Sequence, residues 1–144
     1  MEYKRINILI MDDDVAMNDA VREKLQKHLD SARLPNMYGE VNLYTFVKRE
    51  KCREMLYSKW FQGDTIAFLD DKNVTPLEFN DLFGFAEGKE NNIEFVLLSH
   101  SEVSHEDIAQ ETDQKPNLKV IRKNRFAPDI CSMYLEQFLA GMKR

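Results

Sequence analysis

Residues 6–14 have the sequence Ile-Asn-Ile-Leu-Ile-Met-Asp-Asp-Asp, a short apolar run that ends in three aspartates. Nearly continuous apolar runs of this length are typical of strands that are covered on both faces of a sheet. Two later segments, Thr65–Leu69 and Ile93–Leu98, have the same character. With Ile6–Met11 they predict three buried strands at the centre of a sheet.

Two further strand candidates mix polar and apolar residues, as strands at the edge of a sheet do. They are Val41–Phe46 and Leu118–Arg122. Strand and helix candidates alternate along the chain, which favours an α/β fold with a parallel sheet. With the second and fifth strands at the edges, we predict a doubly wound five-stranded parallel sheet of order 2-1-3-4-5, a flavodoxin-like fold.

Helical periodicity fills the intervals between the predicted strands. Pro76 is placed to open the third helix, the fourth is expected near Glu106–Glu111, and the fifth starts around Pro128–Asp129. The apolar positions that mark the other helices are Met17, Val21, Leu25 and Leu29 in the first, Cys52, Met55, Leu56 and Trp60 in the second, Phe79, Leu82, Phe83 and Ala86 in the third, and Met133, Phe138 and Met142 in the fifth. No internal repeat or linker interrupts the pattern, so residues 1–144 are predicted to form one domain.

The bulk properties exclude several classes of protein. The chain has 144 residues, 43% of them hydrophobic and 31% charged, which suits a globular domain with a full core. Its net charge of −5 argues against bulk attraction to nucleic acid or to anionic membranes. No apolar run approaches the roughly 20 residues that span a bilayer, and the N-terminus does not have the pattern of a signal peptide. Cys52 and Cys131 lie far apart without metal-ligand spacing. We therefore expect a cytoplasmic protein with no attached output domain.

The predicted strands are followed by residues that can bind metal ions and phosphate. Asp12–Asp14 follow the first strand, Asp70-Asp71 the third, Ser99 the fourth and Lys123 the fifth. In an open parallel sheet, ligands bind beyond the carboxyl ends of the strands, at the point where the strand order reverses. For the order 2-1-3-4-5, this point lies between the two strands that end in carboxylates.

This combination of side chains suits phosphoryl transfer. Clustered carboxylates repel one another unless a cation neutralises them, and carboxylates with a backbone carbonyl and waters are typical Mg²⁺ ligands. An aspartate beside such an ion can attack phosphorus and form an aspartyl-phosphate. The hydroxyl of Ser99 and the ammonium of Lys123 would then bind the phosphoryl oxygens.

With these motifs, the sequence resembles the receiver domain of bacterial two-component response regulators. The resemblance covers nearly the whole chain, and its order is more specific than any one motif. The motifs that carry it are Ile8-Leu9-Ile10-Met11-Asp12-Asp13-Asp14, Ala67-Phe68-Leu69-Asp70, Val96-Leu97-Leu98-Ser99 and Ile121-Arg122-Lys123.

The resemblance implies a role for each residue at the predicted site. Asp70 would be the phosphoryl acceptor, and Asp12 and Asp13 would form an acid pocket. Mg²⁺ would be held by these three aspartates and by the backbone carbonyl of Lys72. The remaining two residues, Ser99 and Lys123, would detect the phosphate.

The resemblance also implies the partners. The phosphoryl donor would be a sensor histidine kinase or a histidine phosphotransfer protein. A downstream protein would bind the face formed by the fourth helix, the fifth strand and the fifth helix. The only chemistry implied is self-catalysed phosphorylation and dephosphorylation at Asp70, so we expect no other enzymatic activity.

Several positions depart from the pattern of the family. Asn124 replaces the proline that usually follows the lysine, and Val74 stands where a proline is usual, with Pro76 two residues later. His100 takes a position that is commonly small, and Val120 replaces the aromatic switch residue. These departures favour an alternative, a pseudo-receiver that binds a partner without phosphorylation, whereas the complete set of acids, hydroxyl and lysine opposes it.

Other interpretations stay open at this point. Taken alone, the aspartates at 12–14 are typical of a helix start, Asp70-Asp71 of a turn, Ser99 of a helix cap and Lys123 of a solvated charge. A second alternative function is a phosphohydrolase of the haloacid dehalogenase type with Asp12 as nucleophile. The order of motifs opposes it, because in such enzymes the second pair of acids follows the lysine.

Overall fold

The computed structural model describes residues 4–31, 38–58, 63–70, 93–99 and 118–142. In order, the elements within these ranges are β1 (Lys4–Met11), α1 (Val15–Ser31), β2 (Tyr38–Phe46), α2 (Arg49–Tyr57), β3 (Asp64–Asp70), β4 (Ile93–Ser99), β5 (Leu118–Arg122) and α5 (Ala127–Met142). The predicted third and fourth helices, with Trp60 and Pro76, lie outside the described residues.

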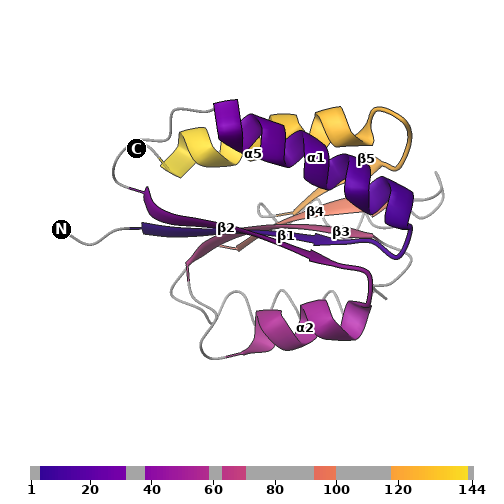
Figure 1. Ribbon diagram of the computed structural model, residues 1–144, viewed down its shortest axis with the longest axis horizontal. Helices are drawn as coiled ribbons and strands as arrows, with labels where there is room; N and C mark the ends of the chain where they lie inside the picture. The colour runs from indigo at the N-terminus through magenta and orange to yellow at the C-terminus, as the bar shows by residue number, and fades with distance from the viewer. Residues whose placement is uncertain (1–3, 32–37, 59–62, 71–92, 100–117, 143–144) are drawn as a thin grey trace.

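The five strands form one parallel sheet with the order β2-β1-β3-β4-β5 (Figure 1). The predicted α/β, flavodoxin-like arrangement is therefore confirmed, and β2 and β5 lie at its two edges as their mixed composition indicated. The strand limits differ by a few residues, most at β2, which begins at Tyr38 rather than at Val41.

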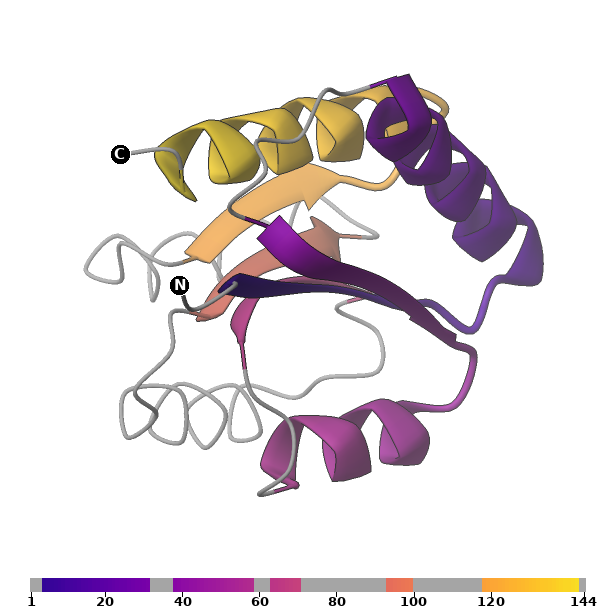
Figure 2. The same cartoon turned by 60° about the vertical axis from the view of Figure 1, so that its left-hand side comes forward.

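Helices cover both faces of the sheet. α1 and α5 lie on one face and α2 on the other, as Figures 1 and 2 show from two directions. Because successive side chains of a strand point to opposite faces, each strand contributes to two cores. The core beneath α1 and α5 contains Ile6, Ile8, Ile10, Val21, Leu25, Ile66, Phe68, Val96, Leu98, Ile121, Ala127, Cys131, Leu135, Phe138 and Leu139. The core beneath α2 contains Leu9, Met11, Cys52, Leu56, Ala67, Leu69, Ile93, Phe95 and Leu97.

One prediction about α5 was wrong. Met133 was expected on its apolar face, but 46% of this residue is exposed. Cys131 and Leu135, two residues before and after it, are fully buried. Two residues correspond to roughly 200° around an α-helix, so a row through Cys131 and Leu135 leaves Met133 on the opposite side. Among the described helices, none is long and apolar enough to cross a membrane.

Candidate metal site

The register of the sheet brings two acids together at its centre. Met11 of β1 pairs with Leu69 of β3, so Asp12 and Asp70 follow at the same level on adjacent strands. Both aspartates are fully buried, and both continue the alternation that points toward α1 and α5. The exposed Asp13 adds a third carboxylate, and one oxygen from each of the three lies within 4.8 Å of the others. This buried acidic cluster has the ligand atoms to hold a metal ion.

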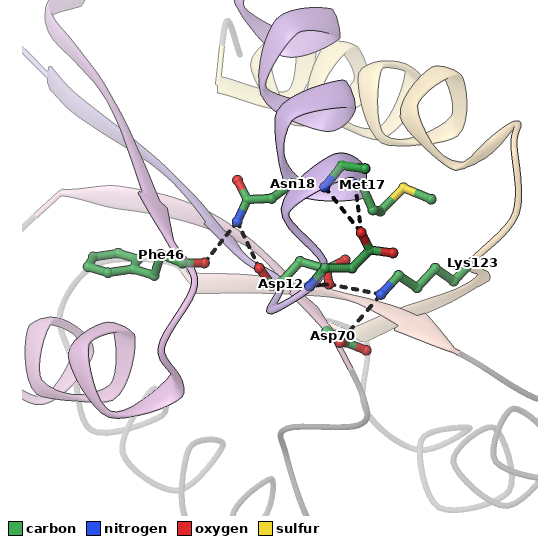
Figure 3. Close-up of polar contacts among 8 residues, drawn as sticks. Asp12, Met17, Asn18, Phe46, Asp70 and Lys123 are labelled. Carbon is green, nitrogen blue, oxygen red and sulfur yellow. Dashed lines mark hydrogen bonds and ion pairs between the residues drawn. The ribbon is translucent and has the colours of Figure 1, made fainter.

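Lys123 reaches the same cluster from β5. Ile121 pairs with Leu98 of β4, which in turn pairs with Asp70, so Lys123 lies two residues beyond the level of the acids. Its long side chain returns to them: Nζ lies 2.8 Å from Oδ1 of Asp12 and 3.5 Å from Oδ2 of Asp70 (Figure 3). Only 7% of this side chain is exposed. The ammonium therefore forms a buried bridge between the two acids.

The environment of Lys123 keeps it charged. Burial alone would lower the pKa of the ammonium, because it removes water from the charged form. The hydrogen bond to Asp12 and the negative charges of Asp70 and Asp12 outweigh burial and raise the pKa above its usual value. Three carboxylates against this one ammonium leave the cluster with a formal charge of −2. A divalent cation would neutralise it.

One oxygen of Asp12 shows where such a cation fits. Oδ1 of Asp12 accepts hydrogen bonds from the backbone N–H of Asp14 and from Lys123. Oδ2 is buried, and among the described residues no donor reaches it. Buried polar atoms nearly always have a partner, and one without a partner requires an explanation such as an ion. The donor set and this oxygen fit a metal ion coordinated by oxygen.

Asp14 has a different role from its two neighbours. Its Oδ1 accepts hydrogen bonds from the backbone N–H groups of Ala16 and Met17, at 3.1 and 3.3 Å, and its backbone carbonyl accepts one from the N–H of Asn18. These contacts cap the first turn of α1. The helix-start interpretation of residues 12–14 is therefore correct for the third aspartate.

Ser99 lies at the end of β4 and is buried. Its backbone carbonyl accepts a hydrogen bond of 2.8 Å from the N–H of Lys123, which extends the pairing of β4 and β5 by one residue. Ser99 follows Phe95 and Leu97 in the alternation of β4, whereas Asp12 and Asp70 continue the opposite face. Binding of phosphate by its hydroxyl stays a prediction. Lys72 and His100 lie outside the described residues, as do Val74 and Pro76.

The two unusual residues around Lys123 have structural roles. Oδ1 of Asn124 accepts a hydrogen bond of 2.8 Å from the N–H of Phe126, and its carbonyl accepts one from the N–H of Ala127. Asn124 thus forms the turn that starts α5. Val120 is partly buried and packs against the core beneath α2.

Asn18 is a functional candidate that was not predicted from the sequence. It is buried on α1, and its Nδ2 donates to the backbone carbonyls of Asp12 and Phe46, at 3.1 and 2.8 Å (Figure 3). A signal was present: Asn18 precedes Val21 by three residues and so occupies the buried face of the helix. A polar residue in an apolar row usually has a specific hydrogen-bond partner.

The two cysteines are not nucleophiles. Cys52 lies in the core beneath α2 and Cys131 in the core beneath α1 and α5, so the sheet separates them. Burial raises the pKa of each thiol to about 12, with a further contribution from the charge of Asp12 at Cys131. At neutral pH both thiols are protonated and unreactive.

Comparison with known proteins assigns the chain to no family. No protein-family model matches the sequence, and neither a curated protein nor a solved structure matches the chain. The function is therefore inferred from the residues of the site.

Proposed function

We propose that the protein is a receiver that accepts a phosphoryl group on Asp70, with Mg²⁺ held by Asp12, Asp13, Asp70 and the backbone carbonyl of Lys72. One observation carries the proposal: three carboxylates and a buried ammonium meet at the carboxyl ends of β1, β3 and β5. This is the point at which the strand order reverses, where open α/β sheets bind their ligands. A cluster that only stabilised the fold would not require a surplus of carboxylates there.

The choice of Mg²⁺ is supported by the chemistry of the ligands. All three side chains offer carboxylate oxygens. Hard cations such as Mg²⁺ prefer oxygen ligands, and Mg²⁺ is usually bound by a small number of carboxylates together with several waters. No cysteine or histidine belongs to the cluster, among the residues that the structure describes. Bound Mg²⁺ would neutralise the acids and the charge on the phosphoryl oxygens.

The proposed reaction is a transfer between two side chains. A carboxylate oxygen of Asp70 attacks the phosphorus of a phosphohistidine and forms a P–O bond. The P–N bond breaks, and its electron pair stays on the imidazole nitrogen, which takes up a proton. Lys123, already beside Asp70, would pair with a phosphoryl oxygen, and the hydroxyl of Ser99 would donate to another. In this proposal the donor is a sensor histidine kinase or a histidine phosphotransfer protein.

Phosphorylation would be detected by a downstream protein that binds one face of the receiver. Lys123 directly follows β5 and precedes the turn that starts α5, so we expect a change in its partners to affect both elements. We propose that a downstream protein binds the face that includes β5 and α5, together with the predicted fourth helix. The proposal involves neither nucleic acid nor membrane.

The experiment is labelling by a small phosphodonor. The protein is incubated with acetyl phosphate, with and without Mg²⁺, and its intact mass is measured. We expect the mass of one added phosphoryl group, only with Mg²⁺, in the wild type and not in Asp70→Asn. Turnover of phosphomonoesters is the second arm: steady turnover by the wild type, lost in Asp12→Asn, would instead support the haloacid dehalogenase type with Asp12 as nucleophile.

One observation favours a second candidate, the pseudo-receiver. Asp70 is fully buried, whereas a phosphoryl acceptor must be reached by its donor. In this alternative the acidic cluster binds a cation and the protein binds its partner without a phosphoryl group. The absence of labelling, together with normal Mg²⁺ binding that Asp70→Asn abolishes, would support the pseudo-receiver.

A further inference from the structure

We propose that Asn18 is a positioning residue for the acidic cluster: its side-chain amide holds the turn of Asp12 and Asp13 in the conformation that binds a divalent cation. The inference rests on the proposed metal site. It adds a residue that contacts neither the metal ion nor the phosphoryl group, and it links the site to the edge strand β2.

The contacts of Asn18 are directed at the turn. Its Nδ2 donates to the backbone carbonyl of Asp12 and to that of Phe46, the last residue of β2. An amide nitrogen has two protons, so these two bonds use its whole donor capacity. The carbonyl of Phe46 also accepts a hydrogen bond of 3.1 Å from the N–H of Asp12. Asp12 is thus fastened to β2 directly and through Asn18.

The planarity of the peptide unit transmits this constraint to Asp13. The carbonyl of Asp12 and the N–H of Asp13 belong to one rigid plane, because rotation about the peptide bond is blocked. Fixing the carbonyl of Asp12 therefore fixes the direction in which the chain enters Asp13. The N–H of Asp12 fixes the preceding plane in the same way. Asn18 supplies the hydrogen bond that fixes the carbonyl of Asp12, and with it the peptide plane that leads into Asp13.

The constraint matters because two of the proposed ligands, Asp12 and Asp13, belong to this turn. Asp12 is buried and held through Oδ1 by Asp14 and Lys123, whereas the side chain of Asp13 is exposed. The direction in which the backbone enters Asp13 sets where its carboxylate starts relative to the buried acids, in addition to the contacts of the side chain itself. Residues that orient ligands from outside the coordination sphere commonly change metal affinity when they are replaced.

Burial also argues that the amide is specific to this task. Only 3% of Asn18 is exposed, and it precedes the fully buried Val21 on the same face of α1. An apolar residue would fit this helix position better if packing alone were needed. The polar group is explained by the two carbonyls that it binds.

The experiment compares two changes in the same helix. Asn18→Leu keeps a similar volume but removes both donors, and Val21→Ala removes packing without touching the turn. Dissociation constants for Mg²⁺ alone are measured by titration calorimetry, under conditions where urea unfolding shows each variant to be folded. We expect Asn18→Leu to weaken Mg²⁺ binding about tenfold and Val21→Ala to bind like the wild type, although both lower the free energy of unfolding.

Three outcomes would decide the matter. Equal affinity of Asn18→Leu and the wild type overturns the role of Asn18 and leaves the proposed metal site intact. Equal weakening in Asn18→Leu and Val21→Ala also overturns it, because loss of stability then explains the effect. No binding by the wild type overturns the metal site itself, and the inference with it. If Asn18→Leu does not fold, Asn18→Ala provides the same comparison.

Discussion

Three consecutive aspartates have three different surroundings, and this separates their functions at the level of single residues. Asp12 is buried and bonded to Lys123, Asp13 is the exposed member of the acidic cluster, and Asp14 caps α1. Replacing each therefore tests a different property. Asp13 contributes charge to the cluster, whereas Asp14 contributes hydrogen bonds to the helix.

We expect Asp13→Asn to weaken Mg²⁺ binding by more than about tenfold, since changes outside the ligand sphere alone cost that much. Its free energy of unfolding without metal should fall by less than that of Asp14→Ala, because removing a like charge from a cluster of acids offsets the loss of the side chain's own contacts. Asp14→Ala should instead lower the free energy of unfolding by about 1 kcal/mol through loss of the cap, with Mg²⁺ affinity close to that of the wild type. Titration calorimetry and urea unfolding of both variants provide the measurements. Weaker Mg²⁺ binding in Asp14→Ala together with lower stability in Asp13→Asn would contradict the roles assigned to these two residues.

Lys123 is predicted to matter for stability as well as for phosphate. In Lys123→Met the carboxylates of Asp12 and Asp70 stay buried without their ammonium partner. Removing one partner of a buried ion pair typically costs about 3 kcal/mol or more, and we expect a loss of that size in urea unfolding without metal.

The matched control is Lys24→Met. Lys24 pairs with Asp129 at the same distance, 2.8 Å, but 47% of the lysine side chain and 61% of the aspartate side chain are exposed. An exposed pair is screened by water, so the loss should be less than about 1 kcal/mol. Equal losses of unfolding free energy in the two variants would show that burial of Lys123 does not strengthen its contribution to stability.

At the level of elements, the apolar composition of the central strands explains what could be predicted. Apolar runs revealed β1, β3 and β4 because a strand covered on both faces has few polar positions. The acids at the ends of β1 and β3 were visible for the same reason, since a charged residue directly after such a run marks the end of its apolar part. Because β1 and β3 are adjacent in the predicted strand order, Asp12 and Asp70 were expected to lie close together.

The turn between β1 and α1 could not be predicted in the same way. Asn18 interacts with Phe46, which is 28 residues away and belongs to another element, so no local pattern contains the contact. The position of Asn18 on the apolar face of α1 was the available signal. Helix α5 shows another case: the helix itself was predicted, but of its buried residues Cys131, Leu135, Phe138 and Leu139 only Phe138 was named, together with the exposed Met133.

The correction to α5 gives a prediction for this element. Leu135 is fully buried against the core beneath α1 and α5, so Leu135→Ala should create a cavity and lower the free energy of unfolding by about 3 kcal/mol. Met133→Ala, two residues earlier, removes a side chain that packs little. It should change the free energy of unfolding by less than about 0.5 kcal/mol. Urea unfolding of the two variants checks both values. A large loss at Met133 would mean that this side of α5 is covered.

For the whole molecule, the site joins parts of the chain that are distant in sequence. Lys123 and Asp12 are 111 residues apart, and Asp70 and Lys123 are 53 residues apart. The cluster can form only when β1, β3 and β5 occupy one sheet, so the unfolded chain has no comparable site. A cation that binds the cluster therefore binds the native state selectively and must stabilise the whole fold.

This linkage predicts how Mg²⁺ acts on stability. Above its dissociation constant, each tenfold increase in free Mg²⁺ should raise the free energy of unfolding by about 1.4 kcal/mol, as expected for a ligand that binds only the native state. Chelation should reverse the effect, and Asp70→Asn should greatly reduce it because one ligand of the cluster is lost. NaCl at equal ionic strength is the control, since general screening of charge would stabilise the protein with either salt. Urea unfolding across a Mg²⁺ series supplies the slope. A wild-type slope no greater than that in NaCl would mean that the surplus carboxylates hold no divalent ion, because selective binding to the native state cannot occur without stabilising it.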